Sequence, residues 1–342
     1  MIFNFWYKIF FWRGLLFFSL SISLSAQQHP IPEVHRLIST GLNQLIKQDF
    51  ENVQKTFTEL DRRFPDIPLG KIFLAANLIT KEYELNMGYS DAVIFKYLND
   101  AAVQSDILLN NNENDVWNNY YKGLAEGFQA YYYGLHNSWV KAFSSGLSAK
   151  KYFNRCIEID PKFYDAYMAI GAYKYWKSEK TRDFSWLFKD EREEGIAMLR
   201  MAIQNQTYHS SLAVHNLVWI YIHKKEFAAA LSELEPMLKQ YPSSRFFKWD
   251  LARILEESDR AGAILVYREI LDSYKNDSRA NRCNEITLNY LIAKNYYALG
   301  NKVKANEYFK LIPPKSNLTT LEVERLGKRL DRIETLGINI NQ

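Results

Sequence analysis

Apolar and small residues recur along this chain at one set of spacings, which predicts pairs of amphipathic helices. The clearest example carries its core positions on two successive helices and ends at a proline: Val214, Leu217, Val218, Tyr221, Ala230, Leu234, Met237 and Pro242. Residues three, four and seven positions apart share one face of a helix, and a proline stops the second helix because it has no N–H to donate. A helix pair of this kind cannot bury its apolar face alone, so it must stack on neighbouring pairs.

Similar sets recur along the chain: Leu37, Gly41, Val53, Phe57 and Leu60; Ala149, Phe153 and Cys156; Tyr167, Ile170, Gly171, Gly195, Leu199 and Ala202; Phe247, Leu251, Ala263, Tyr267 and Ile270; Ile292, Ala293, Tyr296, Ala305, Phe309 and Ile312. Their spacing resembles the tetratricopeptide repeat, a helix–turn–helix unit of about 34 residues. The sequence therefore predicts an all-α protein, a right-handed superhelical α-solenoid of such pairs over residues 33–342. The second helix after Gly171 comes late, which predicts an insertion at residues 176–190. A final amphipathic helix at residues 319–336 is expected to cap the solenoid.

Residues 1–26 have the pattern of a signal peptide. Lys8 and Arg13 supply positive charge, an apolar run follows, and Ala26 is a small residue suited to cleavage before Gln27. We expect an exported protein in the periplasm or cell envelope. The alternative is an uncleaved N-terminal membrane anchor, because the aromatic start and the apolar run together approach the roughly 20 residues that span a bilayer.

Charge gives no reason to expect a nucleic-acid partner. The formal charge of +4 falls to +2 without residues 1–26, since Lys8 and Arg13 leave and no acidic residue does. No phosphate loop, nucleophile elbow or zinc-ligand cluster occurs in the sequence, so we expect no catalytic residues, metal or cofactor. The two cysteines, Cys156 and Cys283, fall in different repeats and are expected to be buried thiols.

The most aromatic helix begins after the polar residues 110–114, and its rings recur at helical spacing: Trp117, Tyr120, Tyr121, Phe128, Tyr131 and Tyr132. We interpret this stripe as core between helices, with a cage for a hydrophobic ligand as the alternative. Phe184, Trp186 and Phe188 in the predicted insertion are expected to fold back onto the solenoid, since exposed aromatic residues at that density favour association.

One stretch resembles a narrower group than the repeat in general. It comprises Ala149-Lys150-Lys151-Tyr152-Phe153, Ile159-Asp160-Pro161, Tyr164-Asp165-Ala166-Tyr167, Gly171 and Tyr173-Lys174-Tyr175-Trp176. It is similar to a eukaryotic tetratricopeptide family that includes a mitochondrial outer-membrane protein and a fungal factor for clearing protein inclusions, and that has exported bacterial relatives. The likeness covers residues 68–275, and its motifs are structural, so it implies the fold more than the function. The predicted export signal departs from that family.

The function that these patterns favour is a non-enzymatic scaffold that binds a protein or peptide, most simply an apolar segment. The resemblance to the repeat implies that the first helix of each pair lines a concave groove, and its inward positions include Asp165, Met168, Tyr175, His215, Trp219, Ile222, Tyr290, Lys294 and Tyr297. Trp219 and Tyr175 are the expected anchors. The alternatives are that these rings only fill the superhelix, that the protein binds lipid or another hydrophobic ligand at the envelope through peripheral membrane association, or that it is a degenerate enzyme subunit.

Overall fold

The described chain consists of helices joined by short connections. The computed structural model describes residues 27–184, 186–187, 189–275 and 282–341, so the predicted signal peptide lies outside the described residues. The helices are α1 (Pro32–Ile46), α2 (Phe50–Arg63), α3 (Leu69–Glu84), α4 (Asp91–Asn111), α5 (Val116–Leu135), α6 (Trp139–Ile159), α7 (Asp165–Lys180), α8 (Arg192–Gln204), α9 (Ser210–His223), α10 (Phe227–Gln240), α11 (Arg245–Ser258), α12 (Arg260–Lys275), α13 (Arg282–Ala298), α14 (Lys302–Phe309), α15 (Thr320–Leu326) and α16 (Arg329–Asn341), with 3₁₀ turns at Arg182–Phe184 and Lys315–Asn317. The described residues contain no strand.

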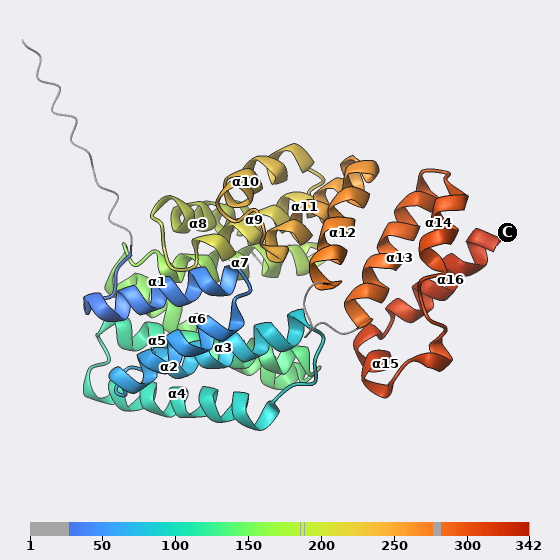
Figure 1. The fold of residues 1–342 in the computed structure, drawn as a ribbon. Coiled ribbons are helices and arrows are strands. Elements are labelled where there is room, and N and C mark those ends of the chain that lie inside the picture. The colour runs from blue at the N-terminus through green and yellow to red at the C-terminus, as the bar shows by residue number, and fades with distance from the viewer. Residues whose placement is uncertain (1–26, 185, 188, 276–281, 342) are drawn as a thin grey trace, which may run out of the picture.

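Successive helices pack as antiparallel pairs from α1–α2 to α13–α14, and the pairs stack along a curved path (Figure 1). The predicted repeat register is confirmed by burial. On α9 and α10, Val214, Leu217 and Ala230 are each at most 2% exposed. Small residues lie where two helices come closest, because a β-carbon added to Gly41 would overlap the ring of Phe57.

Most pairs turn through one residue in the left-handed conformation. Gln48, Asn86, Asn137 and Lys225 have φ between 52° and 60°, and each follows the first helix of its pair. A left-handed residue at this place ends a helix and lets its last carbonyls accept hydrogen bonds. Gly300 does the same between α13 and α14. These short turns fix each second helix antiparallel to its first.

The N-terminal helices also contact the C-terminal half of the solenoid. The carboxylate of Glu84, the last residue of α3, accepts hydrogen bonds from Arg245 Nε and Tyr274 Oη, both at 2.7 Å. Asn284 donates to the backbone carbonyl of Glu84 at 2.8 Å, and Leu85 is fully buried among residues of α11, α12 and α13. The superhelix is therefore bridged by contacts between residues some 160 to 200 positions apart.

Contacts of α1 extend this bridge. Ser244, before α11, donates to the carbonyl of Ile46 at the end of α1, and Gln48 accepts from the backbone N–H of Arg245. At the other end of α1, His35 shares a 2.6 Å hydrogen bond with Tyr208, just before α9. Together with Glu84, these residues cover the side of the solenoid where the first helices α9, α11 and α13 begin.

Two predicted boundaries differ from the observed ones. Residues 176–180 continue α7, so the connection to α8 spans only residues 181–191. The predicted capping helix at 319–336 is two helices, α15 and α16, because Gly327 adopts a φ of 47° and ends the first of them. Trp186 is 79% exposed, so its side chain does not fold back as expected. The side chain of Phe184 and the whole of Phe188 lie outside the described part of the chain.

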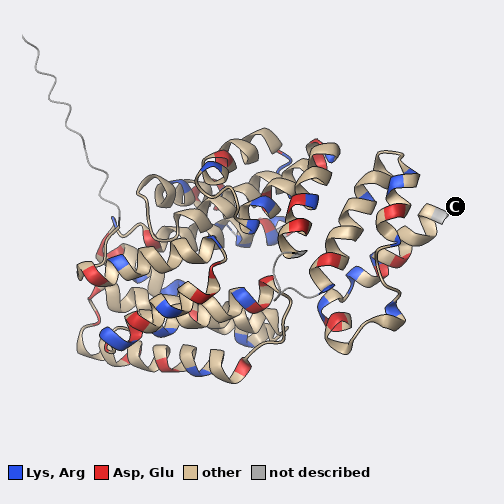
Figure 2. Cartoon of the chain, viewed as in Figure 1, with Lys and Arg blue, Asp and Glu red and all other residues tan. Residues whose placement is uncertain are grey.

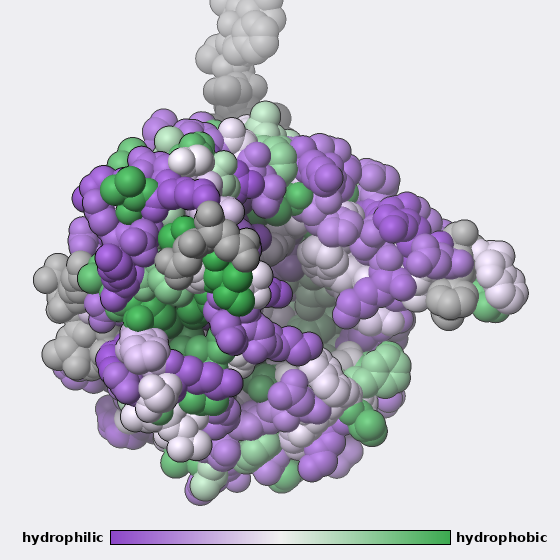
Figure 3. Space-filling model, turned by 90° about the vertical axis from the view of Figure 1, so that its right-hand side faces the viewer, coloured by the Kyte–Doolittle hydropathy of each residue, from purple (hydrophilic) through white to green (hydrophobic). Residues whose placement is uncertain are grey.

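Charge and hydropathy are mixed over the surface. Lysine, arginine, aspartate and glutamate alternate along most helices rather than forming one large patch of a single sign (Figure 2). Seen from the end that carries α13–α16, the molecule is hollowed near its centre, and hydrophobic residues gather in and beside the hollow (Figure 3). Among the described residues, no helix is both long enough and apolar enough to cross a bilayer.

Candidate functional site

The predicted groove positions lie where the first helices of neighbouring pairs meet. Polar side chains at these positions bridge one first helix to the next. His215 of α9 contacts Asp250 of α11, with His215 Nδ1 at 2.9 Å from Asp250 Oδ2, and Trp219 Nε1 donates to Asp250 Oδ1 at 3.0 Å. One pair further on, Lys294 of α13 donates to the buried carboxylate of Glu256 at 2.6 Å. The structure therefore brings His215 and Trp219 together, and places Lys294 two helix pairs further along, on α13.

Asp250 links this part of the groove to the core. Its side chain is buried, and desolvation by burial raises its pKa, while the hydrogen bonds from His215 and Trp219 act in the opposite direction. The rings of His215 and Phe246 lie 4.6 Å apart beside it. The indole of Trp219 is thus held by one fixed hydrogen bond and remains partly exposed.

Three of the predicted groove residues are buried in this conformation. Asp165 is 1% exposed, and its Oδ1 lies 3.2 Å from Nδ1 of His209, which in turn lies 3.0 Å from Tyr120 Oη. Tyr175 is 1% exposed and Tyr290 is 7% exposed. Met168, Ile222 and Tyr297 are half-buried, so with Trp219 they are the apolar groove residues that a partner can reach.

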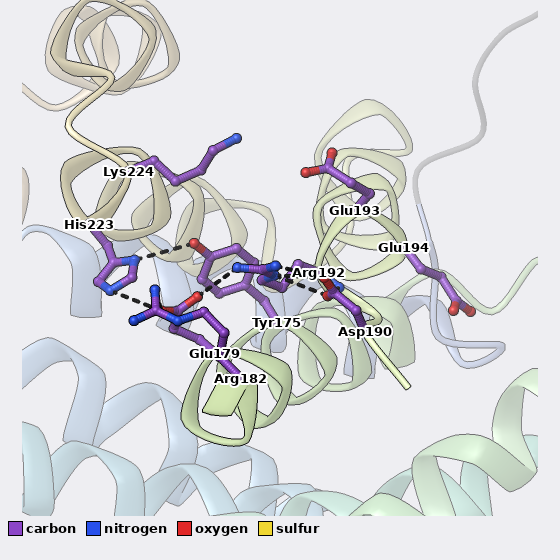
Figure 4. A pocket seen from close by; sticks show the side chains of 9 residues that line it. All are labelled: Tyr175, Glu179, Arg182, Asp190, Arg192, Glu193, Glu194, His223 and Lys224. Atoms are coloured by element: carbon purple, nitrogen blue, oxygen red, sulfur yellow. Dashed lines mark hydrogen bonds and ion pairs between the residues drawn. The ribbon is translucent and has the colours of Figure 1, made fainter. Parts of the chain in front are cut away.

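A polar pocket of about 410 Å³ opens beside Tyr175, at the ends of α7 and α9. Its lining comes from α7, from the connection to α8, from the first turn of α8 and from the end of α9: Tyr175, Glu179, Arg182, Asp190, Arg192, Glu193, Glu194, His223 and Lys224 (Figure 4). One face of α9, which we call the Trp219 face, carries His215, Trp219 and His223, because residues four and eight positions apart differ by only about 40° and 80° around a helix. The pocket therefore continues the Trp219 face.

Ion pairs organise the floor of the pocket. Glu179, whose side chain is only 12% exposed, accepts hydrogen bonds from Arg182 and Arg192, each at 3.0 Å. Arg192 also pairs with Asp190, and that hydrogen bond lowers the pKa of Asp190 and raises the pKa of Arg192. Burial raises the pKa of Tyr175 to about 12, with nearby Glu179 adding to the shift.

The charges of the pocket are of both signs, which suits a polar or zwitterionic group better than a single ion. Lys224 and Glu193 face each other across the opening in Figure 4. Within the described ranges, no three His, Cys, Asp or Glu side chains are arranged to hold a metal ion. The side chains that line the pocket are therefore suited to bind a polar group through hydrogen bonds and ion pairs.

The aromatic stripe of α5 belongs mainly to the interior. Tyr120, Tyr121 and Tyr132 are at most 4% exposed. Trp117 and Tyr120 each meet the ring of Phe163 in an edge-to-face contact, at 5.0 and 5.1 Å between ring centroids. Edge-to-face packing is a favoured geometry for buried aromatic rings. These residues therefore belong to the core between helices, which was the preferred interpretation of the stripe.

Sequence reasoning missed most of the pocket. Among the residues that line the pocket, it singled out only Tyr175. The signal that was available is the spacing of His215, Trp219 and His223 on α9, which places them on one face. The position of Arg182 and Arg192 depends on the path of residues 181–191, which no repeat pattern specifies.

The sequence matches no family model, and no curated protein matches it. Among solved structures, a chain of the APC/C hetero-tetramer Cut9–Hcn1 aligns with a TM-score of 0.53 and 14% identity, over 89% of this chain and 51% of that chain. The chain has the tetratricopeptide-repeat fold. It spans about half the length of the Cut9–Hcn1 chain.

Two further tetratricopeptide structures are similar over most of their length, but at TM-scores too low to add weight. One is a tetratricopeptide repeat protein from Parabacteroides merdae ATCC 43184, with 12% identity and a TM-score of 0.27 over 90% of this chain and 92% of that chain. The other is the tetratricopeptide domain of P58(IPK), with 10% identity and a TM-score of 0.25 over 90% of this chain and 99% of that chain. The narrower likeness to the mitochondrial and fungal family is not tested by these structures and stays a prediction.

Proposed function

We propose that this tetratricopeptide protein is a non-enzymatic scaffold that binds a segment of another protein along the Trp219 face of α9. The observation that carries the proposal is that Trp219, Ile222 and His223 share one face of α9, which is partly exposed and leads into the 410 Å³ pocket. Solenoids of this kind commonly use their concave surface for binding.

The surface favours a segment with an apolar stretch and a polar end. Trp219 and Ile222 offer apolar contact area, and half-buried Met168 on α7 adds to it. The paired charges at Glu179 and Arg192 would then satisfy the polar end of the segment through hydrogen bonds. Contacts from α1 and the end of α3 lie at the N-terminal ends of α9 and α11, whereas the pocket opens at the C-terminal end of α9, where a partner can reach it.

Replacement of Trp219 tests this proposal. Trp219→Ala removes a large aromatic anchor, and we expect recovery of the protein partner to fall at least about tenfold, as for an interface hot spot. Trp219→Phe keeps a ring but loses the hydrogen bond to Asp250, so most of the binding should remain. Val103→Ala on α4, at a position that is 61% exposed and outside this face, is the control. Unchanged partner binding by folded Trp219→Ala would show that the face is not the binding surface.

The export of the protein is part of the same proposal. Residues 1–26 have the composition of a signal peptide, and Gln27, the first residue after them, accepts a hydrogen bond from the backbone N–H of Tyr164 through its Oε1 at 3.1 Å. A processed chain that begins at Gln27 would therefore have its first residue fixed to the solenoid. We propose the periplasm or cell envelope as its location, with an uncleaved membrane anchor as the alternative.

A further inference from the structure

The first half of α6 exposes apolar side chains that no part of the described chain covers. Trp139 is 66% exposed, Val140 85%, Phe143 68% and Leu147 42%. At about 100° per residue, these four side chains fall within an arc of roughly 100° around the helix. Exposed apolar stripes of this density usually mark a contact surface.

The stripe is separate from the face by which α6 packs on the solenoid. That packing face consists of Ala149, Phe153 and Cys156, all at most 6% exposed. Because α6 already buries one face against α5, the exposed stripe is not needed to hold the helix in place. It is also distinct from the Trp219 face, which lies on the first helices of the pairs.

The charged residues in the stretch of sequence that carries the stripe are all lysine or arginine. Between Gly127 and Ile157, across the second half of α5 and nearly all of α6, the sequence has no aspartate or glutamate but has Lys141, Lys150, Lys151 and Arg155. Lys150 and Lys151 follow Leu147 by about one turn and lie near the same side of the helix. The nearby acidic residue Asp91 accepts a hydrogen bond from Tyr132 and lies 3.3 Å from Nε2 of His136.

We propose that this stripe docks the protein on the surface of an anionic lipid bilayer. A helix with tryptophan and phenylalanine on one face and lysine beside it is the pattern of an interfacial membrane-binding helix. Tryptophan is favoured at the level of the lipid headgroups, and each lysine near the surface adds electrostatic attraction to anionic lipid. Trp139, Val140 and Phe143 lie in the first turns of α6, so they would enter the headgroup region first.

Charge argues against a second copy of this chain as the occupant. A symmetric contact through the stripe would bring the lysines of two α6 helices toward each other, with no acidic residue on either stripe to balance them. An anionic bilayer instead supplies the opposite charge for each lysine. A protein partner is the alternative that the experiment must separate.

A local reporter tests the docking in the full chain, where the apolar residues 1–26 could bind lipid by themselves. Both native cysteines are at most 1% exposed, so an environment-sensitive fluorophore can be placed selectively on Val140→Cys. Trp186→Cys, at a position that is 79% exposed on the connection after α7, is the matched control. The probe is a vesicle of phosphatidylcholine, with or without phosphatidylglycerol.

We expect a blue shift of the label at position 140 with phosphatidylglycerol vesicles, little shift with phosphatidylcholine alone, and no shift at position 186. Adding salt should weaken the response. In the Val140→Cys background, Lys150→Gln/Lys151→Gln should lower vesicle affinity by roughly fivefold per lysine, and Trp139→Ser/Phe143→Ser should abolish the shift. An unshifted label at position 140, or equal shifts at both positions, would overturn the proposal. So would loss of a soluble protein partner by Trp139→Ser/Phe143→Ser when vesicles cause no shift.

Discussion

The contact between α7 and α8 makes a sharp prediction about Gly171. A β-carbon at Gly171 would lie 2.7 Å from the carbonyl oxygen of Gly195 and 3.0 Å from Cβ of Met198. The reciprocal β-carbon at Gly195 would lie 2.6 Å from the carbonyl oxygen of Gly171. These neighbours are backbone or near-backbone atoms that cannot rotate away, so Gly171→Ala must push the two helices apart.

Two opposing contributions determine how Gly171→Ala changes the free energy of unfolding. Glycine to alanine inside a helix gains about 1 kcal/mol of intrinsic helix stability. Overpacking a close contact typically costs about 1–3 kcal/mol. Because the added β-carbon meets backbone atoms of α8, we expect a cost in the upper part of that range, about 2–3 kcal/mol. The net destabilisation should then be about 1–2 kcal/mol for Gly171→Ala and more for Gly171→Leu.

Gly127 in α5 provides the matched control. A β-carbon there would meet its nearest neighbours, Ala149 and Phe153, at an ordinary 3.9 Å. Gly127→Ala should therefore raise the free energy of unfolding by up to about 1 kcal/mol. The two variants should move the midpoint of denaturant unfolding in opposite directions. If Gly171→Ala were as stable as the parent or more so, the close crossing of α7 and α8 would be refuted.

Two other predictions concern the start of the chain. Burial lowers the pKa of His29 to about 4. Its Nδ1 accepts from the backbone N–H of Ile31, so the neutral ring is the form that fits. A depressed histidine pKa means that the folded state binds fewer protons than the unfolded state. The free energy of unfolding should thus fall as the pH drops from about 6.5 toward 4, by up to roughly 3 kcal/mol. In thermal melts, His29→Gln should lose this part of the pH dependence. If the variant and the parent had the same pH profile, this role of His29 would be contradicted. For export, N-terminal sequencing of the mature protein should start at Gln27 or within about two residues of it, whereas recovery of intact Met1 from membranes would favour the anchor.

The repeat register could be predicted from the sequence because it depends on local spacing. Gly171 and Gly195 fall at repeat positions of one predicted helix pair, and their added β-carbons would each meet the other's backbone. Side-chain size at fixed intervals is sufficient to predict such a contact, since only a small residue allows two helix backbones to approach closely.

The bridge between the two halves of the chain could not be predicted in this way. Glu84 meets Arg245 across 161 positions, and this contact depends on the accumulated curvature of all the intervening pairs. The pocket beside Tyr175 depends likewise on the path of residues 181–191. At the C-terminal end, a continuous apolar stripe predicted one helix, but the left-handed Gly327 divides it into two.

Site-specific photo-crosslinking in intact cells is the most direct measurement of whether the Trp219 face binds a partner. A photoreactive residue at Ile222, next to the pocket, should yield a discrete adduct with another protein. The same residue at Val103 on α4, a position that is 61% exposed on a second helix, should yield none. An adduct at position 103 with none at position 222 would contradict binding along the Trp219 face.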